Sequence, residues 1–288
     1  MAPLALGTVQ FGLRYGVSNQ AGQVTPSEVT AILSTAAAAG IDTLDTAIAY
    51  GESEASLGRA GVSGWRVITK LPPLPAEIAS LEGWIEQELD NSLRRLGLSQ
   101  LDAVLLHRSS DLLGSRGAQY LQALLKLGPG RFRFLGVSIY DPAELDALWP
   151  VWQPEVVQAP CNVLDRRLVS SGWLARLASH AVRVHTRSTF LQGLLLMSPE
   201  RRPPAFARWS ALLNRWLEWC RENEKSPLEA SLGFVHSLPG VERVVVGVDS
   251  AAHLLQILEA LRTPCCEPPA DLSSADRDLI DPSRWKLS

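Results

Sequence analysis

The stretch LDAVLLH, residues 101–107, is apolar at every position except Asp102 and the terminal His107. A strand with one face in solvent alternates apolar and polar residues, and this stretch does not. Strands that are buried on both faces, as in parallel sheets, have such nearly continuous apolar runs. We therefore interpret the stretch as a buried strand of a parallel sheet that ends in a titratable side chain.

Short apolar runs of the same kind recur along the whole chain. They are PLALGTV (3–9), IDTLD (41–45), WRVITK (65–70), FRFLGVS (132–138), EVVQAP (155–160), AVRVHTR (181–187) and VERVVVGV (241–248). Between runs, residues 26–39 and 81–96 repeat apolar side chains at helical spacing, and Gly40 and Gly97 follow where a left-handed C-cap is favoured. Strands that alternate with helices in this way favour a parallel sheet.

Three of the predicted helices begin with the same chemistry. The segments are TPSE (25–28), DPAE (141–144) and SPLE (226–229). Each offers an oxygen-bearing N-cap, a proline at the first helical position and a glutamate at the third. We expect Glu28, Glu144 and Glu229 each to close a capping box on its own helix.

The number of strands indicates the fold class. Eight parallel strands close a (β/α)8 barrel, and such barrels routinely form one domain. An open doubly wound sheet would usually carry a G-x-G-x-x-G turn after its first strand, which residues 7–16, GTVQFGLRYG, do not match. We expect an α/β protein with a single TIM barrel of parallel strands over residues 1–288.

Composition excludes several classes of function. The net charge is -3, so the chain has no basic field to attract nucleic acid or an anionic membrane. No apolar run approaches the roughly 18–20 residues that cross a bilayer, and the start of the sequence lacks a cationic signal-peptide region, so we expect a cytoplasmic protein. The four cysteines, Cys161, Cys220, Cys265 and Cys266, are expected to be reduced, and no spacing suggests a metal site.

Titratable side chains stand where several predicted strands end. Asp45 ends one strand, Tyr50 lies in the loop that follows, Lys70 ends the next strand and His107 the one after. In a (β/α)8 barrel the active site lies at the C-terminal ends of the strands. Because these strands are consecutive, we expect the four side chains to converge at the mouth of the barrel.

Such a set of groups suits proton transfer to an oxygen. A free tyrosine, with a pKa near 10, is a weak acid at neutral pH, but a nearby ammonium stabilises the phenolate. An aspartate beside the lysine keeps the ammonium charged, and a neutral histidine donates a hydrogen bond to a substrate oxygen. Carbonyl reduction needs these functions, together with a source of hydride.

The motifs that contain these residues resemble those of the aldo-keto reductase superfamily. DTAIAYGESEASLG (45–58) is similar to the signature D-T-A-x-x-Y-G-x-S-E-x-x-L-G, and VITK (67–70) and LDAVLLH (101–107) are similar to the segments that end in the family lysine and histidine. GVS (136–138), QAPCNVLDR (158–166) and RSTFLQGLL (187–195) match in order and spacing, and the opening LGTVQFG (6–12) and closing VVVGVDS (244–250) fit too. The resemblance covers residues 3 to about 260.

The resemblance implies a (β/α)8 barrel that reduces aldehydes and ketones with NADPH or NADH. It implies that Tyr50 is the general acid, Lys70 its activator, Asp45 the partner of Lys70, and His107 the group that orients the carbonyl. The cofactor would contact Gly7, Thr8, Asp45, Ser138, Gln158, Arg187, Ser188, Leu191, Gly193, Gly247, Asp249, Ser250, His253 and Gln256. The candidate substrate contacts are Phe11, Tyr15, Tyr50, His107 and Tyr140.

Two positions depart from the family pattern on the cofactor side. Arg187 stands where relatives often have an aromatic ring that stacks on the nicotinamide, and a cation there disfavours NAD⁺ relative to NADH. Asp249 stands where NADPH-preferring relatives have a lysine or arginine for the 2′-phosphate, so NADH stays open as the cofactor.

Two other functions remain compatible with the sequence. A barrel aldolase or isomerase could use Lys70 for a Schiff base. That reaction needs a desolvated lysine without a neighbouring acid, so Asp45 argues against it. A non-catalytic, NAD(P)H-binding regulatory subunit of the same fold is the second alternative. The sequence does not identify the carbonyl substrate. It also leaves the oligomeric state open, although it is compatible with a monomer.

Overall fold

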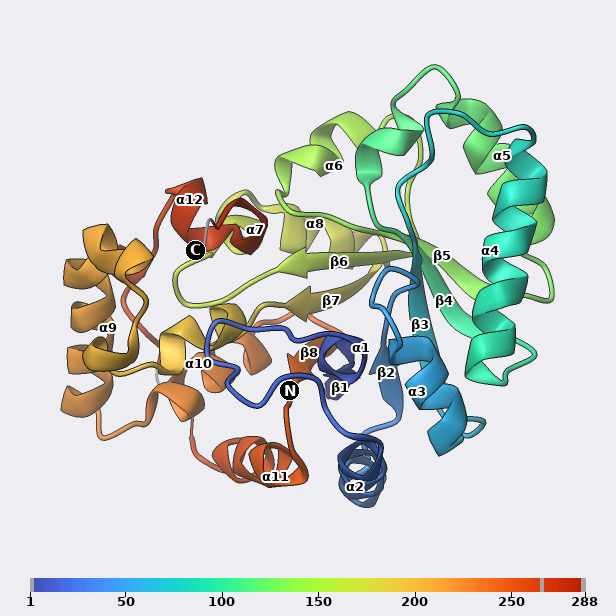
Figure 1. The fold of residues 1–288 in the computed structure, drawn as a ribbon. Coiled ribbons are helices and arrows are strands. Elements are labelled where there is room, and N and C mark those ends of the chain that lie inside the picture. The colour runs from blue at the N-terminus through green and yellow to red at the C-terminus, as the bar shows by residue number, and fades with distance from the viewer. Residues whose placement is uncertain (1–2, 265–266, 286–288) are drawn as a thin grey trace.

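The fold of the chain is a closed barrel of eight parallel strands. The computed structural model describes residues 3–264 and 267–285. The strands are β1 (Leu4–Gly7), β2 (Thr43–Asp45), β3 (Arg66–Leu71), β4 (Leu101–Leu106), β5 (Phe132–Ser138), β6 (Val156–Pro160), β7 (Arg183–Arg187) and β8 (Arg243–Gly247). They pair in sequence order, and β1 pairs with β8 to close the barrel (Figure 1). The prediction of a (β/α)8 TIM barrel is confirmed.

Helices follow the strands and cover the outside of the barrel (Figure 1). They are α2 (Pro26–Ala38), α3 (Ser53–Ala60), α4 (Leu81–Leu96), α5 (Gly117–Leu127), α6 (Ala143–Leu148), α8 (Trp173–Ser179), α10 (Pro227–His236) and α11 (Ala251–Ala260). Additional helices are the long α9 (Ser210–Glu222) and the short α1 (Val9–Gly12), α7 (Arg167–Ser170) and α12 (Arg277–Ile280). The 3₁₀ turns are η1 (Ser109–Leu112), η2 (Leu191–Leu196), η3 (Pro199–Arg201), η4 (Pro204–Trp209), η5 (Ala270–Leu272) and η6 (Pro282–Arg284).

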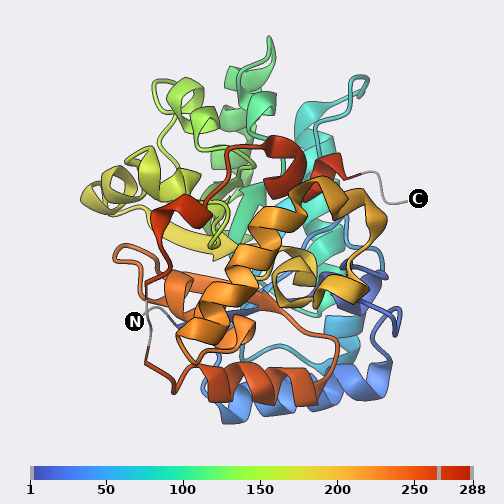
Figure 2. The same cartoon turned by 90° about the vertical axis from the view of Figure 1, so that its left-hand side faces the viewer.

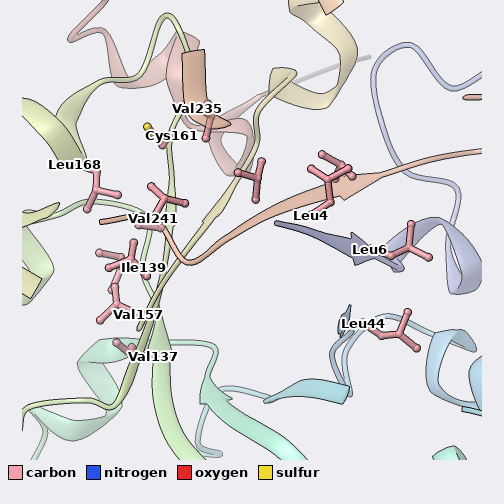
Figure 3. Packing of buried hydrophobic residues seen from close by; sticks show 14 of the residues in the cluster. Leu4, Leu6, Leu44, Val137, Ile139, Val157, Cys161, Leu168, Val235 and Val241 are labelled. Carbon is pink, nitrogen blue, oxygen red and sulfur yellow. The ribbon is translucent and has the colours of Figure 1, made fainter. Parts of the chain in front are cut away.

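The two faces of the strands have different roles. Outward-facing side chains such as Leu6, Leu44 and Val157 belong to the main hydrophobic core between barrel and helices (Figure 3). A second, small apolar cluster of Ile68, Ala103, Leu105 and Val156 lies inside the barrel. A Cβ on Gly136 would lie 2.3 Å from the Val156 carbonyl oxygen, so β5 needs glycine there. Nearer the mouth, polar side chains occupy the interior of the barrel, and the candidate site lies there.

The expected capping boxes form on one of the three helices. On α10 the Ser226 hydroxyl and the Glu229 carboxylate form the complete box. On α2 the Thr25 side chain accepts from the Glu28 amide, but the Glu28 carboxylate binds another helix instead of returning to Thr25. On α6 the Glu144 carboxylate accepts from the Asp141 and Tyr140 amides, so its half of the box forms, but the Asp141 carboxylate accepts from the Ala143 amide and not from the Glu144 amide. A carboxylate on a flexible stem takes whichever free amide lies nearest in the folded chain.

The segment around α9 and the C-terminal segment pack on each other beside the mouth of the barrel (Figure 2). Arg208 pairs with Asp276 and Asp278, and the Phe206 ring meets the Trp285 ring edge-on at 4.8 Å. The proline-rich stretch 198–206, read from the sequence as a surface loop, forms η3 and the start of η4 and buries Phe206.

Two further sequence expectations concern membranes and thiols. In the part of the chain that the structure describes, no helix combines the length and apolarity needed to cross a bilayer. Cys161 and Cys220 are buried in the core, whereas Cys265 and Cys266 lie outside the described residues.

We expect the stability of the protein to depend on pH, because a histidine is buried inside the barrel. His185 on β7 is 4% exposed, and within residues 3–264 and 267–285 its Nδ1 has no hydrogen-bond partner. Burial, followed by the positive charges of Arg243 and Arg183, lowers the pKa of His185 to about 4, although Asp45 opposes the shift. The unfolded chain therefore binds this proton more readily, so stability present above about pH 6.5 is lost as the pH falls toward 4.

We expect the free energy of unfolding to fall by about 2 kcal/mol through this group between pH 7 and pH 5. Urea titrations at the two pH values check this, with His185→Gln losing this part of the pH dependence. The same change at the exposed His180 is the control, and it should follow the wild type. An equal pH dependence in wild type and His185→Gln would contradict the prediction.

Candidate active site

Four side chains meet at the C-terminal mouth of the barrel, as the sequence predicted. Asp45 ends β2, Lys70 lies near the end of β3, His107 follows β4 directly, and Tyr50 lies in the loop before α3. Lys70 Nζ donates to Asp45 Oδ2 at 2.8 Å and to the Thr46 carbonyl at 2.9 Å. It lies 5.0 Å from the centre of the Tyr50 ring, and the Tyr50 and His107 rings are 6.0 Å apart, edge to face.

The electrostatics set the protonation states of two of these groups. Burial disfavours the charged form of Lys70, but the Asp45 carboxylate and then Tyr50 outweigh burial and raise the pKa of Lys70 above its ordinary value. Burial, and next the positive charges of Lys70 and Arg187, lower the pKa of His107 to about 4. At neutral pH the site therefore contains a buried ammonium ion and a neutral imidazole.

A chain of buried hydrogen bonds continues from Asp45 across the barrel interior. Gln158 Nε2 donates to Asp45 Oδ1 at 2.6 Å, and Ser138 Oγ donates to Gln158 Oε1 at 3.2 Å. Both carboxylate oxygens of Asp45 therefore have a donor, Lys70 on one side and Gln158 on the other. The carboxylate is fixed in orientation, and so is the lysine that it binds.

The loop that carries Tyr50 is anchored by residues whose roles the sequence did not reveal. The Glu54 carboxylate is 1% exposed and accepts from Thr69, Ser92 and Arg95, which belong to β3 and α4. A Cβ on Gly12 would lie 1.9 Å from the Tyr50 carbonyl oxygen, so the start of the chain can pack on this loop only through glycine. The serine–glutamate pair of the motif thus fixes the loop to the barrel.

A cleft of about 990 Å³ opens beside Tyr50 and His107 and runs to the first turn of α11. That volume lies at the upper end of the range for ligand pockets. The predicted residues that line it are Gly7, Thr8, Tyr15, Asp45, Tyr50, His107, Ser138, Tyr140, Arg187, Ser188, Gly193, Gly247, Asp249, His253 and Gln256. The structure therefore gathers most of the predicted site residues around one cavity.

Five predicted residues do not line this cleft. They are Phe11, Lys70, Gln158, Leu191 and Ser250. Phe11 and Leu191 are fully buried in the hydrophobic core. The amide of Gln158 is engaged by Asp45 and Ser138, so it supports the wall at Ser138 from behind. Direct contact of these five residues with a ligand stays a prediction.

Two polar side chains of the cleft wall have buried atoms without partners within the described residues, and one of them, Gln10, was not among the predicted site residues. The buried atoms Gln10 Oε1 and Thr189 Oγ1 have no hydrogen-bond partner within the described residues. Gly193 has a φ of +89°, and a Cβ there would lie 2.0 Å from Ser18 Oγ. The Val17 amide donates to the Gln192 carbonyl at 3.1 Å, so two segments of the cleft wall touch each other. Unsatisfied polar atoms and glycine-lined walls suit a long polar ligand such as a dinucleotide.

Arg187 projects from the end of β7 into the same cleft. Its guanidinium lies 4.6 Å from the centre of the Tyr140 ring and donates to the Ile139 carbonyl at 3.1 Å and to Ser188 Oγ at 3.2 Å. No carboxylate within residues 3–264 and 267–285 forms an ion pair with it. The cleft therefore carries an uncompensated positive charge close to His107.

The fold is a (β/α)8 barrel with Asp45, Tyr50, Lys70 and His107 at its mouth and a long cleft beside them. This combination is typical of a class of barrel oxidoreductases. The pattern that describes the Aldo/keto reductase family matches residues 3–267. The chain belongs to the aldo/keto reductase family, whose members are oxidoreductases that generally use NAD(P)H. No protein with a curated description matches the sequence significantly.

Solved structures share the fold at low sequence identity. An aldo-keto reductase from Bacillus halodurans is 19% identical with a TM-score of 0.71, covering 98% of this chain and 95% of its own. The glycerol dehydrogenase from Gluconobacter oxydans is 21% identical with a TM-score of 0.67, covering 93% of this chain and 88% of its own. A Pseudomonas aeruginosa protein assigned to the aldo-keto reductases is 24% identical with a TM-score of 0.64, covering 90% and 88%. At these identities the likeness concerns the fold.

Proposed function

We propose that the protein reduces an aldehyde or ketone to an alcohol with NAD(P)H, and that Tyr50 is the general acid. The observation that carries this proposal is the Lys70 ammonium, held 2.8 Å from Asp45 and 5.0 Å from the Tyr50 ring, beside a neutral His107. Ionisable groups with perturbed pKa values cluster at functional sites, and a buried cation beside a phenol suits proton transfer to an oxygen.

Each group then has one task in the reaction. The nicotinamide cofactor, when bound, supplies the hydride that the carbonyl carbon receives. His107 donates a hydrogen bond to the carbonyl oxygen and so orients the substrate. Tyr50 gives its phenolic proton to that oxygen as negative charge develops there, and Lys70 stabilises the phenolate that is left. Asp45 holds the ammonium in its charged form.

The cleft offers the groups that a dinucleotide needs. Ser138 lines the cleft and would meet the nicotinamide carboxamide, and the unpaired atoms of Gln10 and Thr189 would form hydrogen bonds with the ligand. The contacts along Ser188 to Gly193 would follow the pyrophosphate. The α11 end of the cleft would receive the adenosine.

The Schiff-base alternative fits this geometry poorly. A lysine that attacks a carbonyl must be a neutral amine, whereas the Asp45 carboxylate raises the pKa of Lys70. A purely regulatory role does not require an ammonium ion beside the Tyr50 phenol, whereas catalysis uses it. Catalysis accounts for all four groups at once.

The direct test follows loss of NADH or NADPH absorbance on addition of 4-nitrobenzaldehyde and of small sugar aldehydes. We expect steady turnover with at least one member of this panel. Binding of the cofactor without turnover of any carbonyl compound would support the regulatory role instead. Trapping of a lysine adduct by borohydride would support the Schiff-base reading.

Because of Arg187, we expect the protein to bind the oxidised and the reduced cofactor with unequal affinity. Its charge would lie beside the nicotinamide ring, which is cationic only when oxidised. Arg187→Gln should therefore strengthen NAD⁺ binding relative to NADH by about fivefold, the effect of two unit charges about 4 Å apart in water. Titrations of both nucleotides by fluorescence measure the ratio. Arg187→Lys keeps the charge and should resemble the wild type, and an unchanged ratio in Arg187→Gln would contradict the prediction.

A further inference from the structure

The first turn of α11 is bound by a carboxylate from a distant part of the chain. Glu28 Oε1 accepts a hydrogen bond from the Ala251 amide at 2.6 Å, although the two residues are 223 positions apart. The N-cap Ser250 accepts from the His253 amide at 3.1 Å. An external anion that approached this turn would meet amides that already have partners, one of them a negative charge.

A second carboxylate stands two residues before Ala251 and lines the cleft. Asp249 is half-buried, and its Oδ1 accepts from Asn19 Nδ2 at 3.3 Å. Around it the described wall consists of Val248, His253, Gln256 and Ile257, without lysine or arginine. The two arginines that line the cleft, Arg187 and Arg201, belong to β7 and η3. The described wall at this end of the cleft therefore carries the acid Asp249 and no lysine or arginine, while Glu28, which does not line the cleft, lies close by on the Ala251 amide.

The packing of two helices brings Glu28 to this place. α2 and α11 lie side by side on the outside of the barrel (Figure 1; Figure 2). Glu28 is in the first turn of α2, and that turn meets the first turn of α11. A carboxylate at a helix N-terminus is favoured by the helix dipole, so the arrangement is stable without a ligand.

A nucleotide that carries a 2′-phosphate would meet repulsion here. The phosphate brings nearly two further negative charges toward Glu28 and Asp249 and would compete with Glu28 for the Ala251 amide. An unphosphorylated ribose instead offers hydroxyl donors, and acidic side chains bind the 2′-hydroxyl in many NAD-binding sites. We propose that Glu28 and Asp249 restrict the cofactor to NADH, with Glu28 as a specificity-determining residue. This inference rests on the proposed function, which places a nicotinamide dinucleotide in the cleft.

The test is a binding measurement that needs no turnover. NADH and NADPH are titrated into the wild type, Glu28→Gln, Asp249→Asn and the double variant by calorimetry. Glutamine keeps an oxygen for the Ala251 amide, so the first turn of α11 retains its partner. We expect the wild type to bind NADH at least about tenfold more tightly than NADPH, since like charges oppose the phosphate. The double variant should bring the two affinities within about threefold of each other.

A matched control removes a charge from the same helix away from the cleft. Glu259 on α11 is 71% exposed and pairs with Arg262 on the surface. Glu259→Gln should keep the wild-type ratio of the two affinities, because its charge is screened from the cleft. The control separates a local effect of Glu28 and Asp249 from a change in net charge.

The outcomes separate the inference from the proposed function. Preference for NADPH in the wild type, or an unchanged ratio in the double variant, would overturn the role of Glu28 and Asp249 and leave the proposed function standing. Binding of neither nucleotide would overturn the proposed function and this inference with it. NADH preference that is lost in the double variant and kept in Glu259→Gln would establish the inference.

Discussion

Tyr50→Phe is expected to lower kcat/KM for carbonyl reduction by about 10²–10⁴-fold, the usual contribution of a positioned general acid. The variant loses the proton that balances the negative charge on the carbonyl oxygen, while the ring that packs beside Lys70 and His107 remains. Cofactor affinity should stay within about twofold of the wild type, because the hydroxyl serves the substrate. Steady-state kinetics and cofactor titration measure the two quantities separately.

Tyr120 provides the matched control for this substitution. It lies on α5 in the hydrophobic core, does not line the cleft, and within the described residues its hydroxyl is buried without a hydrogen-bond partner. Tyr120→Phe removes the same atom and should leave kcat/KM unchanged. If Tyr50→Phe reduced the carbonyl substrate at the wild-type rate, Tyr50 would not be the general acid.

Lys70→Met is expected to lower the free energy of unfolding by about 3–5 kcal/mol, since it leaves the Asp45 carboxylate buried without its cation. Lys70 is 1% and Asp45 4% exposed, so water cannot replace the lost ammonium. Gln158 remains as a single donor to the carboxylate. Urea unfolding monitored by tryptophan fluorescence gives the free energy, and turnover should be abolished.

A double substitution separates the structural from the chemical role of this pair. Lys70→Met combined with Asp45→Asn removes both charges, and most of the lost stability should return although activity does not. Lys126→Met breaks the exposed pair with Glu82 and should change stability by less than about 1 kcal/mol. A loss below about 1 kcal/mol in Lys70→Met would show that the buried pair is not an essential part of the fold.

Most of the fold could be predicted from local patterns in the sequence. The predicted bounds of the strand over 132–138 and of the helix over 81–96 agree with the structure, and the other predicted strands differ by a few residues at their ends. Strand and helix periods depend on neighbours two to four positions away, and these neighbours are visible in the sequence. The convergence of Asp45, Lys70 and His107 followed, because the carboxyl ends of consecutive barrel strands are adjacent.

Side-chain partners between distant segments could not be predicted in the same way. The sequence assigned Glu28 to a capping box on α2, but the packing of α2 against α11 offers it the Ala251 amide. The sequence also did not reveal that the Gln158 amide lies between Ser138 and Asp45, and the predicted contact of Gln158 with the nicotinamide stays a prediction. Glu54 received no role at all, although it joins the loop of Tyr50 to β3 and α4.

The sequence by itself therefore determined the barrel, the family and the four residues at its mouth, since these depend on local period and strand order. Tertiary structure alone decided which oxygen meets which amide. A long polar side chain reaches several partners, and only the packing of the helices and strands around it selects one. That selection placed the Glu28 carboxylate on the Ala251 amide, close to Asp249, and our proposal about the cofactor rests on this arrangement.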